Sequence, residues 1–308
     1  MKIITGIDGG GTKTDFVATD EKGRIIKRII KGSSNPIDIG AEKAVQVLVD
    51  GISDLGVKPT HLFAGLSGGI SGDNKEKIYK GLKDGIGEDV CISNGTDAVN
   101  VLNCGLIKGA KAVVISGTGS VCFVRKGNDL VRIGGWGYLI DKGAGGYDFG
   151  REALYYALCD LDGRGEHTLI TDLANAKAGG IVENLGKIYS EGKPYIASFA
   201  PIVFEAYAQG DKTAEEIIKQ NATEYAKLIN RAWEVNGEDE CTVVLGGSMF
   251  KQWHVLQKFI QPLLKYKTNF VLADMPPVYG AVLEAALGAD VDIDTFDKTL
   301  REELANEA

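Results

Sequence analysis

The stretch IDGGGTKTD, Ile7 to Asp15, decides how the N-terminal part of the chain folds. Three glycines in it separate an aspartate from a Thr-Lys-Thr segment. Residues 2–8 before the glycines have a strand-like pattern, and residues 16–19 after them are β-branched, aromatic or small. A turn at residues 20–23 follows soon. The pattern therefore predicts two antiparallel strands joined by a glycine hairpin.

This hairpin differs from the common phosphate-binding motifs that open a helix. A P-loop requires GxxxxGK(S/T), and no glycine precedes Lys13 at that spacing; the Rossmann pattern GxGxxG would need a glycine where Thr14 stands. Glycine permits positive φ, so we expect the N–H groups of Gly9–Gly11 to converge on an anion; a plain glycine hairpin is the alternative. Asp8, at the end of a buried strand, is well placed to hold Mg²⁺ through water.

Composition is typical of a globular protein with about two domains. The chain has 308 residues, of which 44% are hydrophobic and 25% charged, and its 41 glycines are roughly twice the average share. The net charge of −8 argues against a surface for nucleic acid or an anionic membrane. No apolar run of about 18 residues is present, and Gly6 and Asp8 interrupt any N-terminal signal core. We therefore expect no nucleic-acid or membrane partner.

Cysteine and histidine usage favours a cytoplasmic protein without structural zinc. The cysteines are odd in number, scattered and free of CxxC pairs, which suits a reducing compartment. They are Cys91, Cys104, Cys122, Cys159 and Cys241. The three histidines lie far apart in the sequence, and none of them is a candidate catalytic base. They are His61, His167 and His254.

Element patterns indicate that one architecture occurs twice. The first part has predicted strands at 2–8, 13–20, 23–31, 61–66 and 89–93, with helices at 41–55, 73–85 and from Asp97. A second meander follows at 110–116, 121–126 and 130–133, with turns at GTGS (117–120) and at Asn128-Asp129. Residues 144–235 are mostly helical, then come a strand at 241–247, a helix at 254–264, a strand at 268–272, a helix ending near Leu287 and a charged surface helix. We interpret the two meanders as an internal duplication of architecture.

Seven sequence blocks carry a resemblance to a known family. They are DGGGTKT (8–14), GSSNPIDIG (32–40), GLSGG (65–69), NGTDA (94–98), ISGTGS (115–120), GGWGYLIDKGAGG (134–146) and LGGSMFK (245–251). With these blocks nearly the whole chain resembles the sugar kinase and actin-like ATPase superfamily, and within it the N-acetylglucosamine kinase and BadF-type ATPase group. The resemblance implies an α/β fold of two ribonuclease H-like (actin-like ATPase) domains, each with a βββαβα core, around an interdomain cleft. We assign residues 1–108 and 109–292 to these domains, with the C-terminal helix 293–308 as a candidate addition to the first.

The resemblance also implies that the chain uses ATP and Mg²⁺. Asp8 would help to place the Mg²⁺ ion. The first phosphate-binding loop would be formed by Gly9, Gly10, Gly11 and Thr12. A second phosphate clamp is implied at Gly117, Thr118, Gly119 and Ser120. Lys13 matches a residue near the phosphates, but its side chain could equally face solvent. Gly246 and Gly247 would let the adenosine approach bare backbone, although they also fit an ordinary αβ turn.

Asp97 matches the family's catalytic acid in the NGTDA block. Its role would be to accept the proton of the acceptor hydroxyl as that oxygen approaches the γ-phosphorus. The alternative is a helix cap, because aspartate is favoured at the N-terminus of a helix. Thr96 could cap the same helix.

For the acceptor, the resemblance points to short polar side chains and one indole. The matching positions are Asn35, Ser67, Trp136, Gly137 and Asp141. Structural roles remain open for each of the first three: a rigid turn, a loop residue and a packing contact. Lys142 departs from the family, which commonly has Asp-Glu-Gly where this chain has Asp141-Lys142-Gly143. One hypothesis is that this base widens acceptance towards a sugar with a carboxylate, such as N-acetylmuramic acid.

The function implied by the resemblance is ATP-dependent phosphorylation of the 6-hydroxyl of an amino sugar. N-acetylglucosamine is the expected substrate, with N-acetylmuramic acid and glucosamine as further candidates, and a homodimer is expected. The alternative is a BadF-type ATPase that couples hydrolysis to activation of a partner enzyme. Such activators hold an iron–sulfur cluster between subunits through cysteines, and here no cysteine follows a glycine-rich loop. A sugar-sensing repressor would need a DNA-binding domain before the first phosphate loop, whereas this sequence starts with the first strand.

Overall fold

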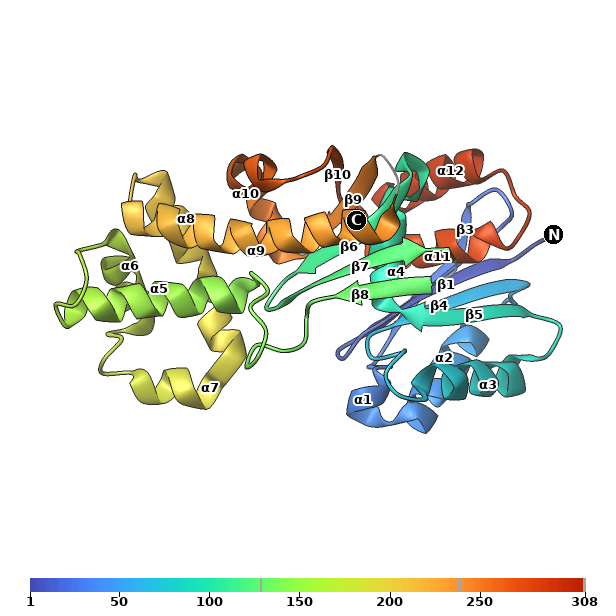
Figure 1. The fold of residues 1–308 in the computed structure, drawn as a ribbon. Helices are drawn as coiled ribbons and strands as arrows, with labels where there is room; N and C mark the ends of the chain where they lie inside the picture. The colour runs from blue at the N-terminus through green and yellow to red at the C-terminus, as the bar shows by residue number, and fades with distance from the viewer. Residues whose placement is uncertain (128, 238–239, 307–308) are drawn as a thin grey trace. The chain divides into compact units, whose positions relative to one another are not determined.

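The computed structural model describes residues 1–127, 129–237 and 240–306. The chain divides into two compact units (Figure 1). Unit 1 comprises Met1–Ala110 and Ala273–Ala308, and unit 2 comprises Lys111–Leu272. Each unit is built on one five-stranded sheet, as the predicted duplication requires.

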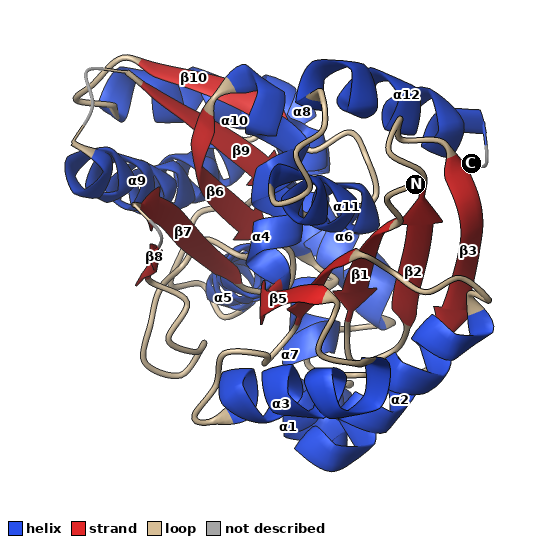
Figure 2. Ribbon diagram, turned by 90° about the vertical axis from the view of Figure 1, so that its right-hand side faces the viewer, coloured by secondary structure: helices blue, strands red, loops and turns tan. Residues whose placement is uncertain are grey.

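The sheet of unit 1 has the strand order β3-β2-β1-β4-β5. Its strands are β1 (Ile4–Gly9), β2 (Thr14–Thr19), β3 (Ile25–Lys31), β4 (His61–Leu66) and β5 (Cys91–Thr96). The first three form an antiparallel meander (Figure 2). Strand β4 is parallel to β1, and β5 is parallel to β4. The predicted hairpin around the three glycines is therefore confirmed.

Helices cover both faces of this sheet. They are α1 (Pro36–Ile39), α2 (Ala41–Asp54), α3 (Asn74–Ile86), α4 (Asp97–Leu102), α11 (Pro277–Leu287) and α12 (Ile293–Asn306), and a 3₁₀ turn η1 (Asn103–Lys108) follows α4. Phe16 lies on the α2 side, so close to Gly51 that a Cβ there would collide with its ring. Gly6 lies on the opposite side, against Val282 of α11. Because successive strand residues face opposite sides, the two faces bury different helices.

The boundary of unit 1 differs from the predicted domain boundary. The sequence predicts residues 273–292 in the second domain, but the structure groups them with unit 1. The physical reason is that α11 lies against β1, where Gly6 allows close approach, and against α4, where Gly280 meets the backbone of Asn100. The terminal helix, whose last two predicted residues lie outside the described part, also belongs here and buries Phe296 and Leu300.

The sheet of unit 2 has the order β10-β9-β6-β7-β8, the counterpart of the order in unit 1. Its strands are β6 (Ala110–Ser116), β7 (Ser120–Lys126), β8 (Asp129–Ile133), β9 (Cys241–Gly246) and β10 (Thr268–Leu272). The strands β6, β7 and β8 form the second antiparallel meander. This equivalence confirms the duplication of architecture. Asn128 of the predicted turn lies outside the described residues.

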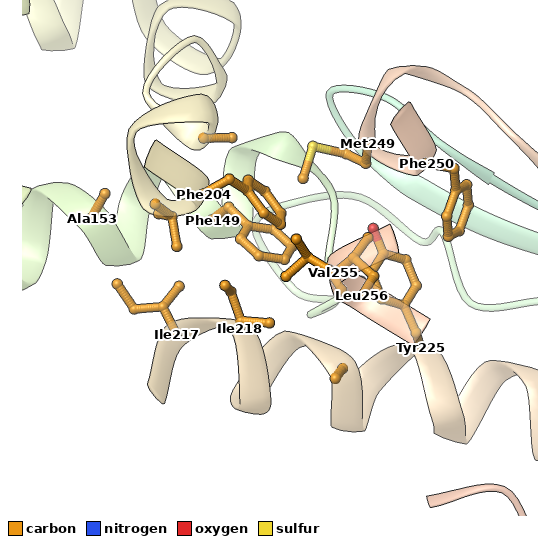
Figure 3. Packing of buried hydrophobic residues seen from close by; sticks show 14 of the residues in the cluster. Phe149, Ala153, Phe204, Ile217, Ile218, Tyr225, Met249, Phe250, Val255 and Leu256 are labelled. Atoms are coloured by element: carbon orange, nitrogen blue, oxygen red, sulfur yellow. The ribbon is translucent and has the colours of Figure 1, made fainter. Parts of the chain in front are cut away.

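Unit 2 carries a helical layer inserted between β8 and β9, as predicted for residues 144–235. Its helices are α5 (Gly146–Leu161), α6 (Leu169–Ala178), α7 (Leu185–Ala197), α8 (Ala200–Ala208) and α9 (Lys212–Asn236), and η2 (Ser248–Gln252), α10 (Trp253–Ile260) and η3 (Gln261–Leu263) follow β9. Figure 3 shows the core where these helices meet: Phe149 of α5 stacks on Phe204 of α8 with ring centroids 5.3 Å apart. Tyr225 of α9 is fully buried, and its hydroxyl is 2.7 Å from Ser116 Oγ at the end of β6. Among the described residues, every helix is too short or too polar to cross a bilayer.

Candidate active site

Three neighbouring strand ends in unit 1 bring Asp8, Ser67 and Asp97 to one edge of the sheet. The strands β1, β4 and β5 run parallel, and their register aligns Asp8 with Gly65 and Gly65 with Gly95. Ser67 follows the last residue of β4, and Asp97 follows the last residue of β5. The carboxyl ends of parallel strands are the usual ligand-binding edge of α/β sheets.

Asp8 is held by a buried amide that the sequence-based prediction missed. Asn100 Nδ2 donates to Asp8 Oδ1 over 2.6 Å and to the carbonyl oxygen of Gly65 over 3.2 Å. Burial raises the pKa of Asp8 to about 6, although the bond from Asn100 lowers it in part. Asn100 stands three residues after Asp97 on α4, and this i, i+3 spacing could have indicated that both face the same edge.

The residues around Asp8 fit a Mg²⁺ ion that arrives with a nucleotide. Mg²⁺ in phosphate-transferring sites uses one or two carboxylates together with phosphate oxygens and water. Asp8 supplies one carboxylate, and the buried Oδ1 atom of Asn100 beside it has no hydrogen-bond partner in the described residues. The described part of the chain holds no group of three or more His, Cys, Asp or Glu side chains that could bind a metal by themselves.

Asp97 begins α4 but does not cap it. Thr96 is the N-cap, because its hydroxyl oxygen accepts a hydrogen bond from the Ala98 N–H. The Thr96 hydroxyl also donates to Asp97 Oδ1 over 2.9 Å. Burial raises the pKa of Asp97, while hydrogen bonds from Thr96 and Ser67 lower it in part. Thr96, and not Asp97, therefore caps the helix. The Asp97 carboxylate is left for another role.

The loop from Gly9 to Lys13 closes by a hydrogen bond from the Gly10 N–H to the Lys13 carbonyl over 3.0 Å. Our expectation of positive φ was wrong, because none of Gly9, Gly10 and Gly11 has it. Gly9 is required for space instead, since a Cβ there would collide with the Ser34 hydroxyl and the Leu66 side chain. Residues 11–13 are exposed, and the N–H groups of Gly11 and Thr12 donate to no described residue. Lys13 lies close enough to Asp8 for its charge to lower the pKa of that carboxyl.

Asn35 stabilises a helix N-terminus. It caps the short helix α1, where its Oδ1 accepts from the Ile37 N–H over 3.0 Å. Its Nδ2 donates to Asp38 Oδ2 over 2.8 Å. The sequence-based prediction did not include Asp38, whose carboxylate lies 3.0 Å from the Cβ position of Gly11 and therefore beside the glycine loop.

Two of the sequence-predicted residues of unit 2, Gly117 and Thr118, line a pocket of about 400 Å³. The basic side chain of Lys251 lines another part of it. Its apolar wall includes Pro194, Pro201, Phe204 and Met249. Figure 3 shows Phe204 and Met249 from the core side. A mostly apolar cavity of this size with a few polar groups is typical of a small-molecule site.

Gly246 and Gly247 border the end of β6 and are not among the residues that line this pocket. Gly247 has φ of 99°, and a Cβ on it would collide with the carbonyl of Ser116. Gly247 therefore lets the chain turn sharply after β9, whose last residue is Gly246. This turn leads directly into residues 248–252, four of which line the pocket.

The second glycine loop, residues 117–119, is fixed on the N-terminus of α5. The Gly117 carbonyl accepts from the Gly146 N–H over 2.7 Å, and the Thr118 carbonyl accepts from the Tyr147 N–H over 2.9 Å. Thr118 and Gly119 are exposed, and their own N–H groups donate to no described residue. The Ser120 hydroxyl donates to the Gly143 carbonyl. The loop thus presents unpaired backbone donors from a rigid support.

Trp136, Gly137 and Asp141 belong to one loop that is tied by its own hydrogen bonds. Asp141 Oδ2 accepts from the Trp136 N–H over 3.0 Å, and the Asp141 N–H donates to the Gly137 carbonyl over 2.9 Å. Trp136 is 62% exposed, with the Arg132 guanidinium 4.5 Å from its ring centroid. Gly137 and Asp141 line a second, small cavity beside Gly119 and Ser120.

Lys142, the departure from the family pattern, is paired inside unit 2. Its Nζ lies 2.9 Å from Glu152 Oε1 on α5. The buried Asn221 of α9 donates to the other Glu152 oxygen over 2.5 Å. Because a protein carboxylate neutralises this ammonium, the structure argues against a free Lys142 charge that selects a sugar carboxylate.

Comparisons with known proteins agree with these features. A model of the BadF/BadG/BcrA/BcrD ATPase family matches residues 5–285. An N-acetylmuramic acid/N-acetylglucosamine kinase of Clostridium acetobutylicum is 32% identical, with 94% of this chain and 100% of the relative covered. An N-acetyl-D-glucosamine kinase of Dictyostelium discoideum is 29% identical over 78% of this chain and 82% of its own. The crystal structure of a candidate N-acetylglucosamine kinase of Chromobacterium violaceum superposes with a TM-score of 0.67 at 22% identity, over 92% of this chain and 98% of that one. The predicted fold is thereby confirmed.

Proposed function

The chain belongs to the BadF/BadG/BcrA/BcrD ATPase family, and from this premise we propose that it is an ATP-dependent kinase of an amino sugar. One observation carries the proposal: a partly buried carboxylate, Asp97, stands at the strand-end edge beside Asp8 and is not used as a helix cap. A hydrolase or a kinase of this fold needs such an acid next to its phosphate-binding loops. The two curated relatives described above are both named as amino-sugar kinases.

ATP is the proposed phosphoryl donor. The adenosine would occupy the pocket of unit 2, with its phosphates at the unpaired N–H groups of Thr118 and Gly119. Gly11 and Thr12 of unit 1 offer the corresponding donors of the first loop. A Mg²⁺ ion held by Asp8 would neutralise phosphate charge, which is the main electrostatic need of phosphoryl transfer.

Asp97 is the proposed general base. Its carboxylate would accept the proton of the acceptor hydroxyl while that oxygen attacks the γ-phosphorus. Burial makes this carboxylate more basic than an exposed aspartate, and Thr96 and Ser67 fix its orientation through hydrogen bonds. Such general base help contributes about 10²–10⁴ in rate, and positioning of the reactants contributes further.

The proposed acceptor is the 6-hydroxyl of N-acetylglucosamine, with N-acetylmuramic acid and glucosamine as further substrates. Support comes from the name of the 32% identical relative, which includes both N-acetylated sugars. Ser67 and Asp141 provide short polar groups that suit sugar hydroxyls. A homodimer in the cytoplasm completes the proposal.

The second candidate function is hydrolysis of ATP coupled to a partner enzyme, because the family description names ATPases. An activator of that kind needs an accessible metal-cluster ligand. Of the five free cysteines only Cys91 is exposed, and it lies at the start of β5, at the end of the strand remote from Asp97. The kinase is therefore the better-supported function.

One experiment separates the two functions. ADP release is followed with Mg²⁺ and ATP, with and without each of N-acetylglucosamine, N-acetylmuramic acid, glucosamine and glucose. We expect release that depends on an amino sugar, with the phosphate found on the 6-oxygen by NMR. Maximal ADP release without any sugar would refute the kinase and favour the ATPase.

A further inference from the structure

Lys193 is a basic residue in unit 2 that none of the sequence motifs includes. It lies where α7 is broken: Gly192 has φ of 60° and ψ of −142°, and Pro194 follows Lys193. Only glycine adopts this conformation readily, and proline removes a backbone donor. The sequence Gly-Lys-Pro therefore explains the break in the helix. Because of the break, Lys193 departs from the regular helical surface.

The Lys193 ammonium lies at the second glycine loop. Its Nζ is 3.4 Å from the position that a Cβ on Gly119 would occupy. It is also 5.1 Å from the ring centroid of Tyr138, a cation–π distance that helps to hold the side chain there. The residue is only partly exposed. A flexible lysine is therefore placed at a defined point of the loop.

This ammonium has no ion pair among the described residues. Neither of the two acids that line the same small cavity, Asp141 and Asp148, forms an ion pair with Lys193 among the described residues. Asp141 accepts from the Trp136 N–H, and Asp148 accepts from the Gly145 N–H over 3.1 Å and lies 3.7 Å from Arg151.

Two further sources of positive potential act at the same loop. The N-terminus of the 16-residue helix α5 donates its first N–H groups to the loop carbonyls, which directs the helix dipole at the loop. The N–H groups of Thr118 and Gly119 are unpaired within the described residues. Together with Lys193 they form a site for a strongly negative group.

The chain neighbours of Lys193 connect this site to the nucleotide pocket. Pro194 lines the 400 Å³ pocket, whereas Lys193 lines the small cavity, and the glycine loop contributes residues to both. A ligand whose apolar part fills the pocket and whose anionic part follows the loop would therefore meet the Lys193 ammonium at its anionic end.

We propose that Lys193 binds the phosphate chain of the nucleotide, with its Nζ paired to a non-bridging oxygen of the terminal phosphates. This inference rests on the proposed function only in that the ligand is ATP, and it holds for kinase and ATPase alike. A lysine suits this role as a compact point charge with three donors. Lys193 is a binding residue here and has no part in proton transfer.

The test compares Lys193→Met and Lys193→Arg with the wild type and with Lys187→Met. Lys187 is a matched control, because it lies on the same helix and has its Nζ 4.9 Å from the ring of Tyr195. Dissociation constants for ATP, ADP and adenosine are measured by calorimetry at two salt concentrations. For Lys193→Met we expect ATP and ADP to bind about ten- to a hundred-fold more weakly, the loss of one charge-assisted contact, while adenosine affinity changes less than about two-fold. Lys193→Arg should restore most of the loss, and Lys187→Met should match the wild type.

Each other outcome would overturn the inference. Unchanged ATP affinity in Lys193→Met would contradict the proposal that Lys193 binds phosphate. If ATP affinity is unchanged and the KM for N-acetylmuramic acid rises, the ammonium binds a sugar carboxylate instead. Equal losses for ATP and adenosine show a role in folding of the pocket. If the wild type does not bind ATP, the proposed function itself is wrong. This result differs from the case in which the wild type and Lys193→Met both bind ATP normally, which contradicts only the role of Lys193.

Discussion

At the scale of single residues, Asp8 and Asp97 are two carboxylates at one sheet edge with different surroundings. Asp8 receives a hydrogen bond from the buried amide of Asn100, whereas Asp97 receives bonds from the hydroxyls of Thr96 and Ser67. Burial raises the pKa of both groups, and the charge of Asp97 raises the pKa of Asp8 further. A cation between phosphate and Asp8 would relieve that repulsion, while Asp97 stays available for a proton.

Replacement of the proposed base should separate turnover from binding. In Asp97→Asn we expect kcat to fall by about 10²–10⁴, because the amide cannot accept the proton. The Kd of ATP should stay within about three-fold of the wild type, since Asp97 is not part of a phosphate loop. Steady-state kinetics with N-acetylglucosamine and calorimetry with ATP check both values. Retention of more than about a tenth of the activity would contradict the assignment.

Asp160 offers a pH test of folding that is independent of the active site. Its carboxylate accepts hydrogen bonds from the Thr171 hydroxyl over 2.6 Å, the Thr168 N–H over 3.1 Å and the His167 ring over 3.0 Å. The bond from Thr171 is the largest of the causes that lower the pKa of Asp160. A lowered pKa in the folded state stabilises the fold above the unfolded value of about 3.9, and this contribution is lost as pH falls through the folded pKa.

We therefore expect Asp160→Asn to lower the free energy of unfolding at pH 7 and to flatten its decrease between about pH 5 and pH 3. Urea unfolding at a series of pH values measures this. Glu166→Gln is the control, because Glu166 is exposed in the loop that follows α5, and this substitution removes the same charge. Parallel pH curves for wild type and Asp160→Asn would show that the carboxylate does not contribute in this way.

At the scale of elements, most helices and strands followed from local pattern, and the exceptions have a tertiary cause. The strand predicted at 89–93 continues to Thr96, although Asn94 and Gly95 are poor strand formers. They remain in the strand because β4 pairs with them residue by residue, Ala64 with Asn94 and Gly65 with Gly95. The prediction of a positive φ at Gly9 was wrong for a similar reason. Glycine is needed there because the Ser34 and Leu66 side chains occupy the space of a Cβ, and this contact cannot be seen in the local sequence.

The contact between α11 and α4 should be essential for the active site. A Cβ at Gly280 would collide with the Asn100 backbone, so Gly280→Ala must displace α4, which carries Asp97. We expect a net loss of about 1–3 kcal/mol in stability despite the better helix propensity of alanine, together with a lower kcat. Urea unfolding and steady-state kinetics measure the two effects.

Gly288→Ala is the matched control at the end of the same helix. Gly288 has φ of −85°, and the nearest heavy atom lies 3.8 Å from its Cβ position, so alanine fits without displacement. This variant should keep the stability of the wild type within about 0.5 kcal/mol. If both variants behave alike, close approach of α11 to α4 is not what positions Asp97.

At the scale of the whole molecule, sequence reasoning found the duplicated sheets but not the boundary between the units. The repeated strand order follows from local patterns that occur twice along the chain. The return of residues 273–306 to unit 1 depends on contacts of α11 with β1, which are far apart in sequence. Likewise, motif residues such as Asp8, Asp97 and Gly117 were identified, whereas Lys193 was not, because only the folded chain brings it beside Gly119. Asn100 was also missed, although its i, i+3 spacing from Asp97 indicates a place at the same edge.

The discontinuous unit 1 and the continuous unit 2 should behave differently when separated. Residues 110–272 contain all five strands of their sheet and the cluster around Phe149, Phe204 and Tyr225, so we expect this fragment to fold alone. Residues 1–110 lack α11 and α12, and the sheet face that includes Gly6 and Val17 would be exposed to water, so this fragment should aggregate or stay unfolded. Fusion of residues 273–306 to residue 110 through a Gly/Ser linker should restore a cooperative urea transition. Circular dichroism and urea unfolding of the three fragments measure this difference. A cooperative transition for residues 1–110 alone would contradict the role given to α11, because the first sheet would then fold without a helix from the C-terminal part of the chain packed on it.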